Sequence, residues 1–148
     1  MPARRGSLAV AILFWMVSAL AAQDSLAMWT RLTDQQLLDG SDVIVTGTLL
    51  GQTRVKSGTT DLTLGVVSVE QTFKGSATGV VLIALPGPDK PVSSTDITYK
   101  AGQSGLWFLR LRGADERGIY VADHPQRFVA RQLAQPQIDW LRKSAPTR

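Results

Sequence analysis

The sequence contains no cysteine and no asparagine, and its single histidine is His124. Without cysteine, the chain has no disulfide, no thiolate nucleophile, no iron–sulfur cluster and no cysteine-ligated zinc. Without asparagine, it has no N-glycosylation motif. One histidine excludes a multi-histidine metal site, and neither a phosphate-binding loop nor a Gly-x-Ser-x-Gly elbow occurs. We therefore expect no metal, no cofactor and no catalytic residue set.

The first 22 residues have the three parts of a secretory signal. Arg4 and Arg5 precede an apolar run that extends from Leu8 to Ala22 and closes on small residues. This run of about 15 residues is shorter than the ~20 that span a bilayer. We predict a cleaved signal peptide over residues 1–22 and a periplasmic or secreted protein with no stable membrane span. The alternative is that the signal remains as an anchor.

The predicted mature chain, residues 23–148, is close to neutral. Without Arg4 and Arg5, 14 Lys and Arg stand against 12 Asp and Glu, a net charge of +2. A nucleic-acid-binding domain usually has a much stronger positive charge, so we expect no nucleic-acid partner. The expected partner is a periplasmic or extracellular protein, or an anionic polymer.

Residues 23–148 predict a single domain with a core over 33–130 and a C-terminal tail or helix over 131–148. Thr33 and Gln36 fit a capping box, and Gly40 is a suitable C-cap, which predicts a short helix over 33–39. Residues 137–143 predict a second short helix that docks through apolar side chains.

Apolar and β-branched residues between these helices predict five strands, over 42–50, 60–73, 79–85, 106–111 and 119–129, the last interrupted at Pro125. A change of apolar phase beside Gly65 predicts a β-bulge in the second strand. Residues 52–59 are interpreted as a polar hairpin connection, 86–104 as an irregular segment, and 97–99 as a short edge strand. The fold class is mainly β, a small five-stranded antiparallel barrel of the OB (oligonucleotide/oligosaccharide-binding) type with short terminal helices. A β-sandwich is the alternative.

Three short motifs carry a resemblance to a known family. They are Asp42-Val43-Ile44-Val45-Thr46-Gly47, Phe73-Lys74-Gly75 and the segment from Lys100 to Leu109. The layout resembles an uncharacterised bacterial secreted domain similar to the OB-type barrel of netrin-like modules and tissue inhibitors of metalloproteinases. The resemblance covers about residues 33–130 and implies the fold. Those inhibitors act through an N-terminal cysteine, which this chain lacks, so the resemblance does not extend to their mechanism.

Phe108, Arg110 and Arg112 alternate along one predicted strand and would share one face. Aromatic and arginine side chains on an OB-type strand can stack on bases or sugars, so this set, with Tyr99, is the candidate binding site. The alternative is that Phe108 packs under a terminal helix while the arginines extend to solvent. Trp107 lies on the opposite face and is expected in the core.

These features favour a non-enzymatic secreted or periplasmic binding module of unknown ligand. A second hypothesis is a protease-inhibitor-like protein that acts through an exposed loop at 86–92. A third is a small hydrolase that uses His124. Adjacent side chains in extended chain point to opposite faces, so Asp123 is poorly placed to orient His124.

Overall fold

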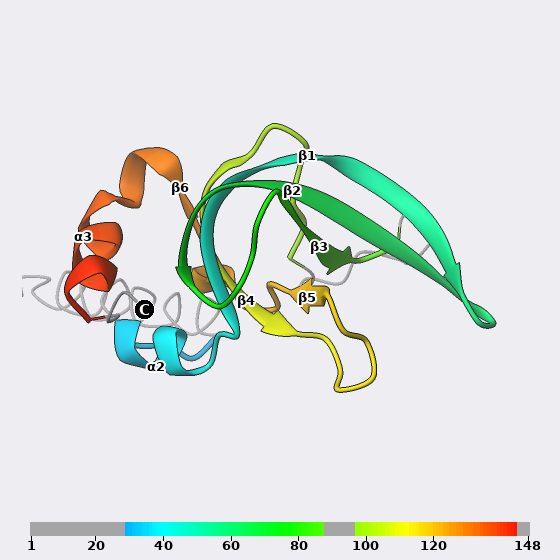
Figure 1. Cartoon of the computed structure of the whole chain (residues 1–148), viewed down its shortest axis with the longest axis horizontal. Helices are drawn as coiled ribbons and strands as arrows, with labels where there is room; N and C mark the ends of the chain where they lie inside the picture. Colours follow the sequence, from blue (N-terminus) through cyan, green and yellow to red (C-terminus); the bar gives the residue numbers. More distant parts are fainter. Residues whose placement is uncertain (1–28, 88–96, 145–148) are drawn as a thin grey trace, which may run out of the picture. The chain divides into compact units, whose positions relative to one another are not determined.

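The computed structural model describes residues 29–87 and 97–144. The predicted signal peptide, residues 1–22, lies outside these residues, as does the centre of the irregular segment, 88–96. The chain divides into two compact units, 1–30 and 31–148. The second unit is mainly β, with a six-stranded sheet and two α-helices, and it contains every feature described below (Figure 1).

The predicted N-terminal helix is confirmed as α2, Asp34–Asp39. The Thr33 side chain accepts a hydrogen bond from the Gln36 backbone N–H, and the Gln36 side chain accepts one from the Thr33 N–H. This capping box satisfies two amides that would otherwise lack a partner within the helix. Gly40 is the C-cap, as predicted.

A long hairpin joins β1, Val43–Ser57, to β2, Thr60–Lys74. The prediction of a polar loop over 52–59 is wrong, because both strands continue to a two-residue turn at Gly58, whose φ is +63°. Arg54 pairs with Thr63 and Lys56 pairs with Asp61 in register. The β1 side of the outer arm, residues 52–57, is exposed, so polar side chains are tolerated on it and the sequence shows no apolar alternation there.

The bulge predicted beside Gly65 lies on the partner strand. Leu50 of β1 is the extra residue, between the pairs Leu49–Val67 and Gly51–Val66, whereas β2 runs in regular register with β3 through Gly65. Two further irregularities lie nearer the start of β1. Gly47 is required at one of them, because a Cβ there would lie 2.3 Å from the Ser68 carbonyl oxygen.

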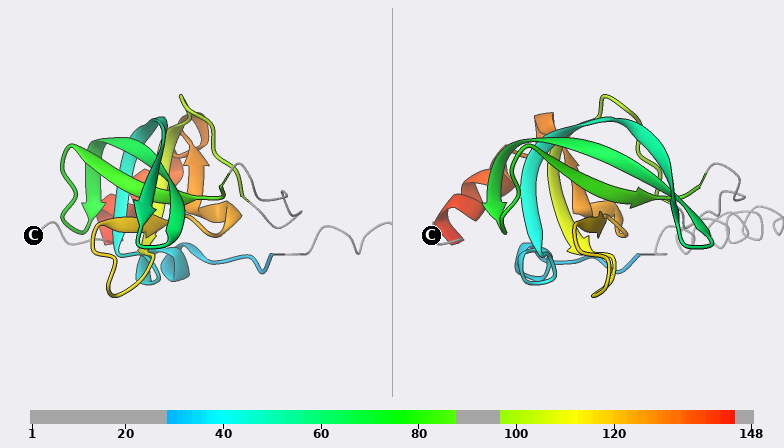
Figure 2. Two further views of the ribbon diagram at one scale, coloured as in Figure 1. Left: turned by 90° about the vertical axis from the view of Figure 1, so that its right-hand side faces the viewer. Right: turned by 45° about the vertical axis from the view of Figure 1, so that its right-hand side comes forward.

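The remaining strands are β3 (Val80–Leu85), β4 (Ser104–Leu111), β5 (Ile119–Val121) and β6 (Phe128–Ala130). The sheet order is β1-β2-β3-β5-β4-β6, and β4 also pairs with β1, so the strands partly form a ring (Figure 2). The β3–β5 pair is parallel, which corrects the all-antiparallel expectation. The prediction of five strands is also wrong, since the 3-10 turn Pro125–Arg127 separates β5 from β6 and the two strands pair differently.

Two apolar cores lie on the two sides of the sheet. The first core lies within the curved sheet and includes Trp107, whose indole N–H donates to the Gly47 carbonyl at 3.1 Å, as expected for a core residue. The second core lies under α2 and the C-terminal helix α3, Gln135–Ser144. A second 3-10 turn, Arg131–Leu133, precedes α3, which confirms and extends the helix predicted over 137–143.

Candidate functional site

The structure places the two aromatic residues of the predicted site in the interior. Phe108 is 1% exposed in the second core, and Tyr99 is 8% exposed in the first. The short edge strand predicted over 97–99 is wrong, since these residues form no strand; the Tyr99 ring is buried and its hydroxyl donates to the Ala122 carbonyl at 3.0 Å. In this conformation neither ring offers a surface for stacking on a ligand.

Arg110 and Arg112 point outward, and each forms an ion pair. Arg110 pairs with Asp123, and the Arg112 guanidinium lies 2.7 Å from the Glu116 carboxylate. The alternative interpretation of this strand face is confirmed in its main part: Phe108 packs beneath the terminal helices, while the arginines reach solvent. The structure does not bring the four predicted residues together.

The electrostatic environment of Asp123 is set by arginine. Partial burial acts to raise the pKa of this carboxyl group, but the hydrogen bond and charge of Arg110, with a smaller contribution from Arg127, lower the pKa below its usual value.

His124 has a local structural role, since its Nδ1 accepts a hydrogen bond from the Gln126 N–H and caps the 3-10 turn. The Asp123 carboxylate is engaged by arginines, which gives no support to an Asp–His catalytic pair.

Arg127 is a buried arginine that the sequence analysis did not single out. Its guanidinium donates to the Gly40 and Phe108 carbonyls and to the Ser41 hydroxyl, at 3.1–3.3 Å. Its Nε lies 3.2 Å from the Asp123 carboxylate. Burial lowers the pKa of the guanidinium and the Asp123 charge opposes this shift. Arg127 therefore joins α2 to β4 and has a structural role.

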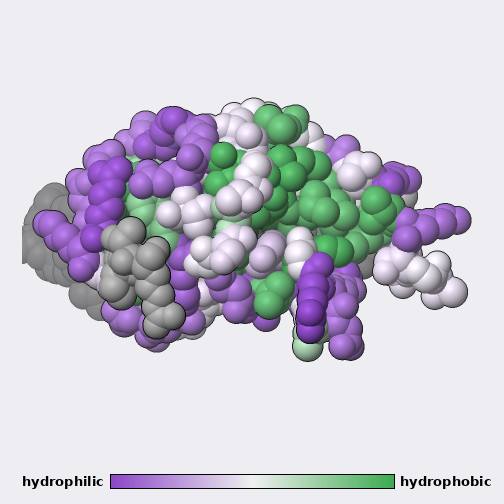
Figure 3. Space-filling model, viewed as in Figure 1, coloured by the Kyte–Doolittle hydropathy of each residue, from purple (hydrophilic) through white to green (hydrophobic). Residues whose placement is uncertain are grey.

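A surface of a different kind lies on the outward side of β2 and β3. Register places Val66 opposite Leu82 and Ser68 opposite Val80, while the alternate residues Val67 and Val81 face the first core. Leu50 is 60% exposed, Val80 53% and Val55 37%. Figure 3 shows apolar side chains gathered over this part of the sheet.

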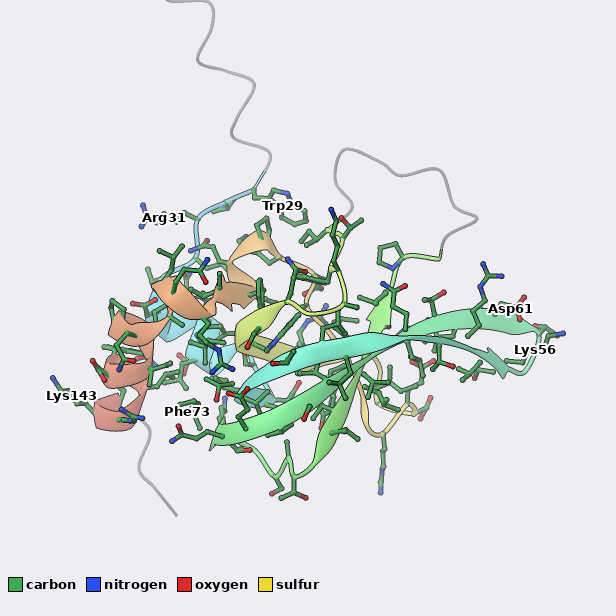
Figure 4. All side chains as sticks on the ribbon, turned by 90° about the horizontal axis from the view of Figure 1, so that it is seen from above. Trp29, Arg31, Lys56, Asp61, Phe73 and Lys143 are labelled. Atoms are coloured by element: carbon green, nitrogen blue, oxygen red, sulfur yellow. The ribbon has the colours of Figure 1, made fainter. Side chains whose placement is uncertain are left out.

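We call this surface the apolar sheet face. Its exposed and half-buried members are Leu50, Thr53, Val55, Val66, Ser68, Val80, Leu82, Ala84 and Ile119, whereas Leu62 and Leu64 on the same side of β2 are buried. No member is charged and none is aromatic. Charged side chains lie at the far end of the hairpin, where Lys56 and Asp61 are labelled in Figure 4. The sequence indicated this surface at one place: the apolar run from Val80 to Leu85 predicts that both faces of β3 are apolar.

The protease-inhibitor hypothesis concerns the segment 86–92, most of which falls outside the part of the chain that the structure describes. Where the chain is described again, its residues support the sheet: Gly102 donates to the Leu49 carbonyl at 2.7 Å, and the Leu49 N–H donates to the Gln103 carbonyl. A binding role for this loop stays a prediction.

Within residues 29–87 and 97–144, no cluster of three or more His, Cys, Asp or Glu side chains could hold a metal ion. In the same ranges, no helix has the length and apolar character to cross a membrane. No model of a known protein family matches the chain, and no curated protein matches it.

Proposed function

We propose that this protein is a non-enzymatic, secreted or periplasmic binding module with an OB-like barrel, and that it binds another protein through the apolar sheet face. The observation that carries the proposal is the exposure of Leu50, Val55 and Val80 on one side of a firmly paired sheet. Contiguous exposed apolar surface of this kind is typical of protein interaction sites. The pattern of residues 1–22 supports secretion.

The strand pairings support the barrel. They run from β1 to β2, β3, β5 and β4 and return from β4 to β1. OB folds are five-stranded, partly open Greek-key barrels that bind ligands on the face of their second and third strands. The apolar sheet face lies on the corresponding strands of this chain, β2 and β3, and extends onto β1 through Leu50 and Val55.

The composition of the apolar sheet face favours protein over other partners. Nucleic acids and anionic polymers require cationic side chains for their charged groups, and single-stranded bases and sugars stack on aromatic rings. The face has neither residue type. Depletion of charge is typical of the centre of a protein–protein interface. We therefore expect a protein partner whose contact surface is itself apolar and uncharged.

The test places a photocrosslinking amino acid at Val80 in the full chain and identifies the adduct by mass spectrometry. The identified partner is then purified, and its affinity is measured for the wild type and for Leu50→Ser and Val80→Ser. Each substitution should weaken binding at least about tenfold, because well-packed apolar contacts at an interface centre contribute 1–2 kcal/mol or more.

Leu133 provides a matched control, because it is 69% exposed and lies on a 3-10 turn away from the apolar sheet face. A crosslinker at Leu133 should not give the same adduct, and Leu133→Ser should leave the affinity unchanged. An adduct between two copies of this chain would contradict the proposal of a different protein partner and would show that the apolar sheet face mediates self-association. Equal affinities of the wild type and both sheet-face variants would refute the proposal.

A further inference from the structure

A pocket of about 220 Å³ lies on another part of the molecule, between the C-terminal helix and the sheet. Its sheet side is formed by Thr46, Glu70 and Gln71, and its helix side by Gln135, Ile138 and Arg142. The volume is smaller than the roughly 300–1,000 Å³ of sites for drug-sized molecules, so it suits a small ligand.

The helix side of the pocket follows from sequence spacing. Gln135, Ile138 and Arg142 are separated by three and four residues, so α3 presents them on one face. Ile138 also packs against the second core, which fixes the helix on the sheet. The pocket thus combines an apolar wall with polar side chains at positions that the fold holds in place.

Arg131, at the start of the second 3-10 turn, is the best-anchored cation of the pocket. Its Nε donates to the Ser104 hydroxyl at 2.8 Å, and its Nη2 bonds both the same hydroxyl and the Glu70 carboxylate. Among residues 29–87 and 97–144, none accepts a hydrogen bond from Nη1 of this guanidinium. The side chain is held in position and still has unused N–H donors.

Arg142 has more unused donors. Within residues 29–87 and 97–144, its one hydrogen-bond partner is the Asp139 carboxylate, at a long distance of 3.5 Å. The same Asp139 oxygen accepts a shorter bond of 2.8 Å from the Gln135 amide. A guanidinium has five N–H groups, so Arg142 retains most of its capacity to bind an anion.

We infer that this pocket binds the carboxylate of a small organic acid. The two arginines provide more donors than Glu70 and Asp139 accept, and the planar guanidinium matches a carboxylate in two-point geometry. Thr46 and Gln71 provide polar groups for a second substituent, and Ile138 contacts an apolar one. This site is independent of the apolar sheet face.

N-acetylalanine is a suitable probe, because it combines a carboxylate, an amide and a methyl group. In a ¹⁵N-resolved NMR titration of the full chain at pH 7, the amides of Gly105, Ala134 and Ile138, which line the pocket, should shift and saturate. N-acetylalanine amide, which has the same shape without the charge, should bind at least tenfold more weakly. Inorganic phosphate tests whether any anion is accepted.

Arg142→Gln should weaken N-acetylalanine binding at least about tenfold, because the substitution removes a charged hydrogen-bond donor to the carboxylate. Arg142→Lys keeps the positive charge but lacks the planar pair of N–H donors of a guanidinium. Its affinity should lie between those of the wild type and Arg142→Gln. Arg112→Gln, in an exposed pair outside the pocket, is the control and should bind as the wild type does. Unchanged thermal unfolding of each variant excludes misfolding.

Three outcomes would overturn the inference: no saturable shift of the pocket amides, equal affinity for the acid and its amide, or tighter binding of phosphate than of N-acetylalanine. None of these results depends on whether the apolar sheet face binds a protein.

Discussion

Tyr99 belongs to the predicted binding site, but the structure places its side chain in the first core. Its ring meets Trp107 edge-on, with centroids 5.1 Å apart, and meets Phe128 at 5.8 Å. Its hydroxyl ties residue 99 to the Ala122 carbonyl just after β5. Burial, aided by the negative charge of Asp123 and opposed by Arg127, raises the pKa of this phenol to about 12.

The pKa of Tyr99 predicts a loss of stability at alkaline pH. Its unfolded pKa is near 10, so between pH 10 and about 12 the unfolded chain loses the phenolic proton first. The free energy of unfolding contributed by this group is intact below pH 10 and falls by about 2–3 kcal/mol as the pH rises to 12. Tyr99→Phe removes this loss.

Urea unfolding of the wild type and Tyr99→Phe at pH 7 and pH 11 checks this prediction. At pH 7 the variant should be less stable by about 1 kcal/mol, the value of one buried hydrogen bond. At pH 11 the difference should shrink or reverse. All other side chains are the same in the two proteins, so the comparison isolates the contribution of Tyr99. The same difference at both pH values would contradict the buried position of the phenol.

At the scale of elements, local sequence signals succeeded where the element depends on its own residues. The Thr33 capping box and Gly40 define α2 because each group bonds within one helical turn. The outer part of β1, residues 51–57, was missed for the opposite reason. This segment is held by its pairing with β2, and its exposed side chains carry no apolar period that sequence could reveal.

Arg127 joins elements that are distant in sequence, and its removal should destabilise the fold. Arg127→Gln leaves the Gly40 and Phe108 carbonyls and the Ser41 hydroxyl without their buried donor. We expect a loss of about 2–4 kcal/mol in the free energy of unfolding, measured in urea.

Arg110→Gln is the matched control, because this arginine also pairs with Asp123 but lies at the surface with 47% of its side chain exposed. Its substitution should cost less than about 1 kcal/mol. A comparable cost for the two variants would mean that the Asp123 ion pair, and not the buried carbonyls, accounts for the role of Arg127.

At the scale of the whole molecule, β1 is the strand that connects the sheet. Residues 43–48 pair with β4 on one edge, and residues 44–49 pair with β2 on the other. Residues 51–57 pair with β2 alone. The first half of β1 is thus bonded on both edges and packed between the two cores, whereas the second half belongs to the exposed arm.

This difference predicts the pattern of amide hydrogen exchange. Amides of residues 44–48 should exchange at least about a hundredfold more slowly than those of 52–57, because they open only when the sheet does. Exchange followed by NMR measures both groups in one sample. Similar protection along the whole of β1 would show that the arm is as stable as the centre of the sheet.

The sequence by itself determined the β class, the capped helix, the helix near the C-terminus and the placement of Trp107 in the core, because these depend on local bonds and on alternation against one core. Tertiary structure decided the parallel β3–β5 pair, the separation of β5 from β6 and the burial of Phe108 and Tyr99. Alternation assigns a side chain to a face but does not reveal what covers that face. In this chain the helices cover Phe108, while the apolar residues Leu50 and Val80 remain exposed.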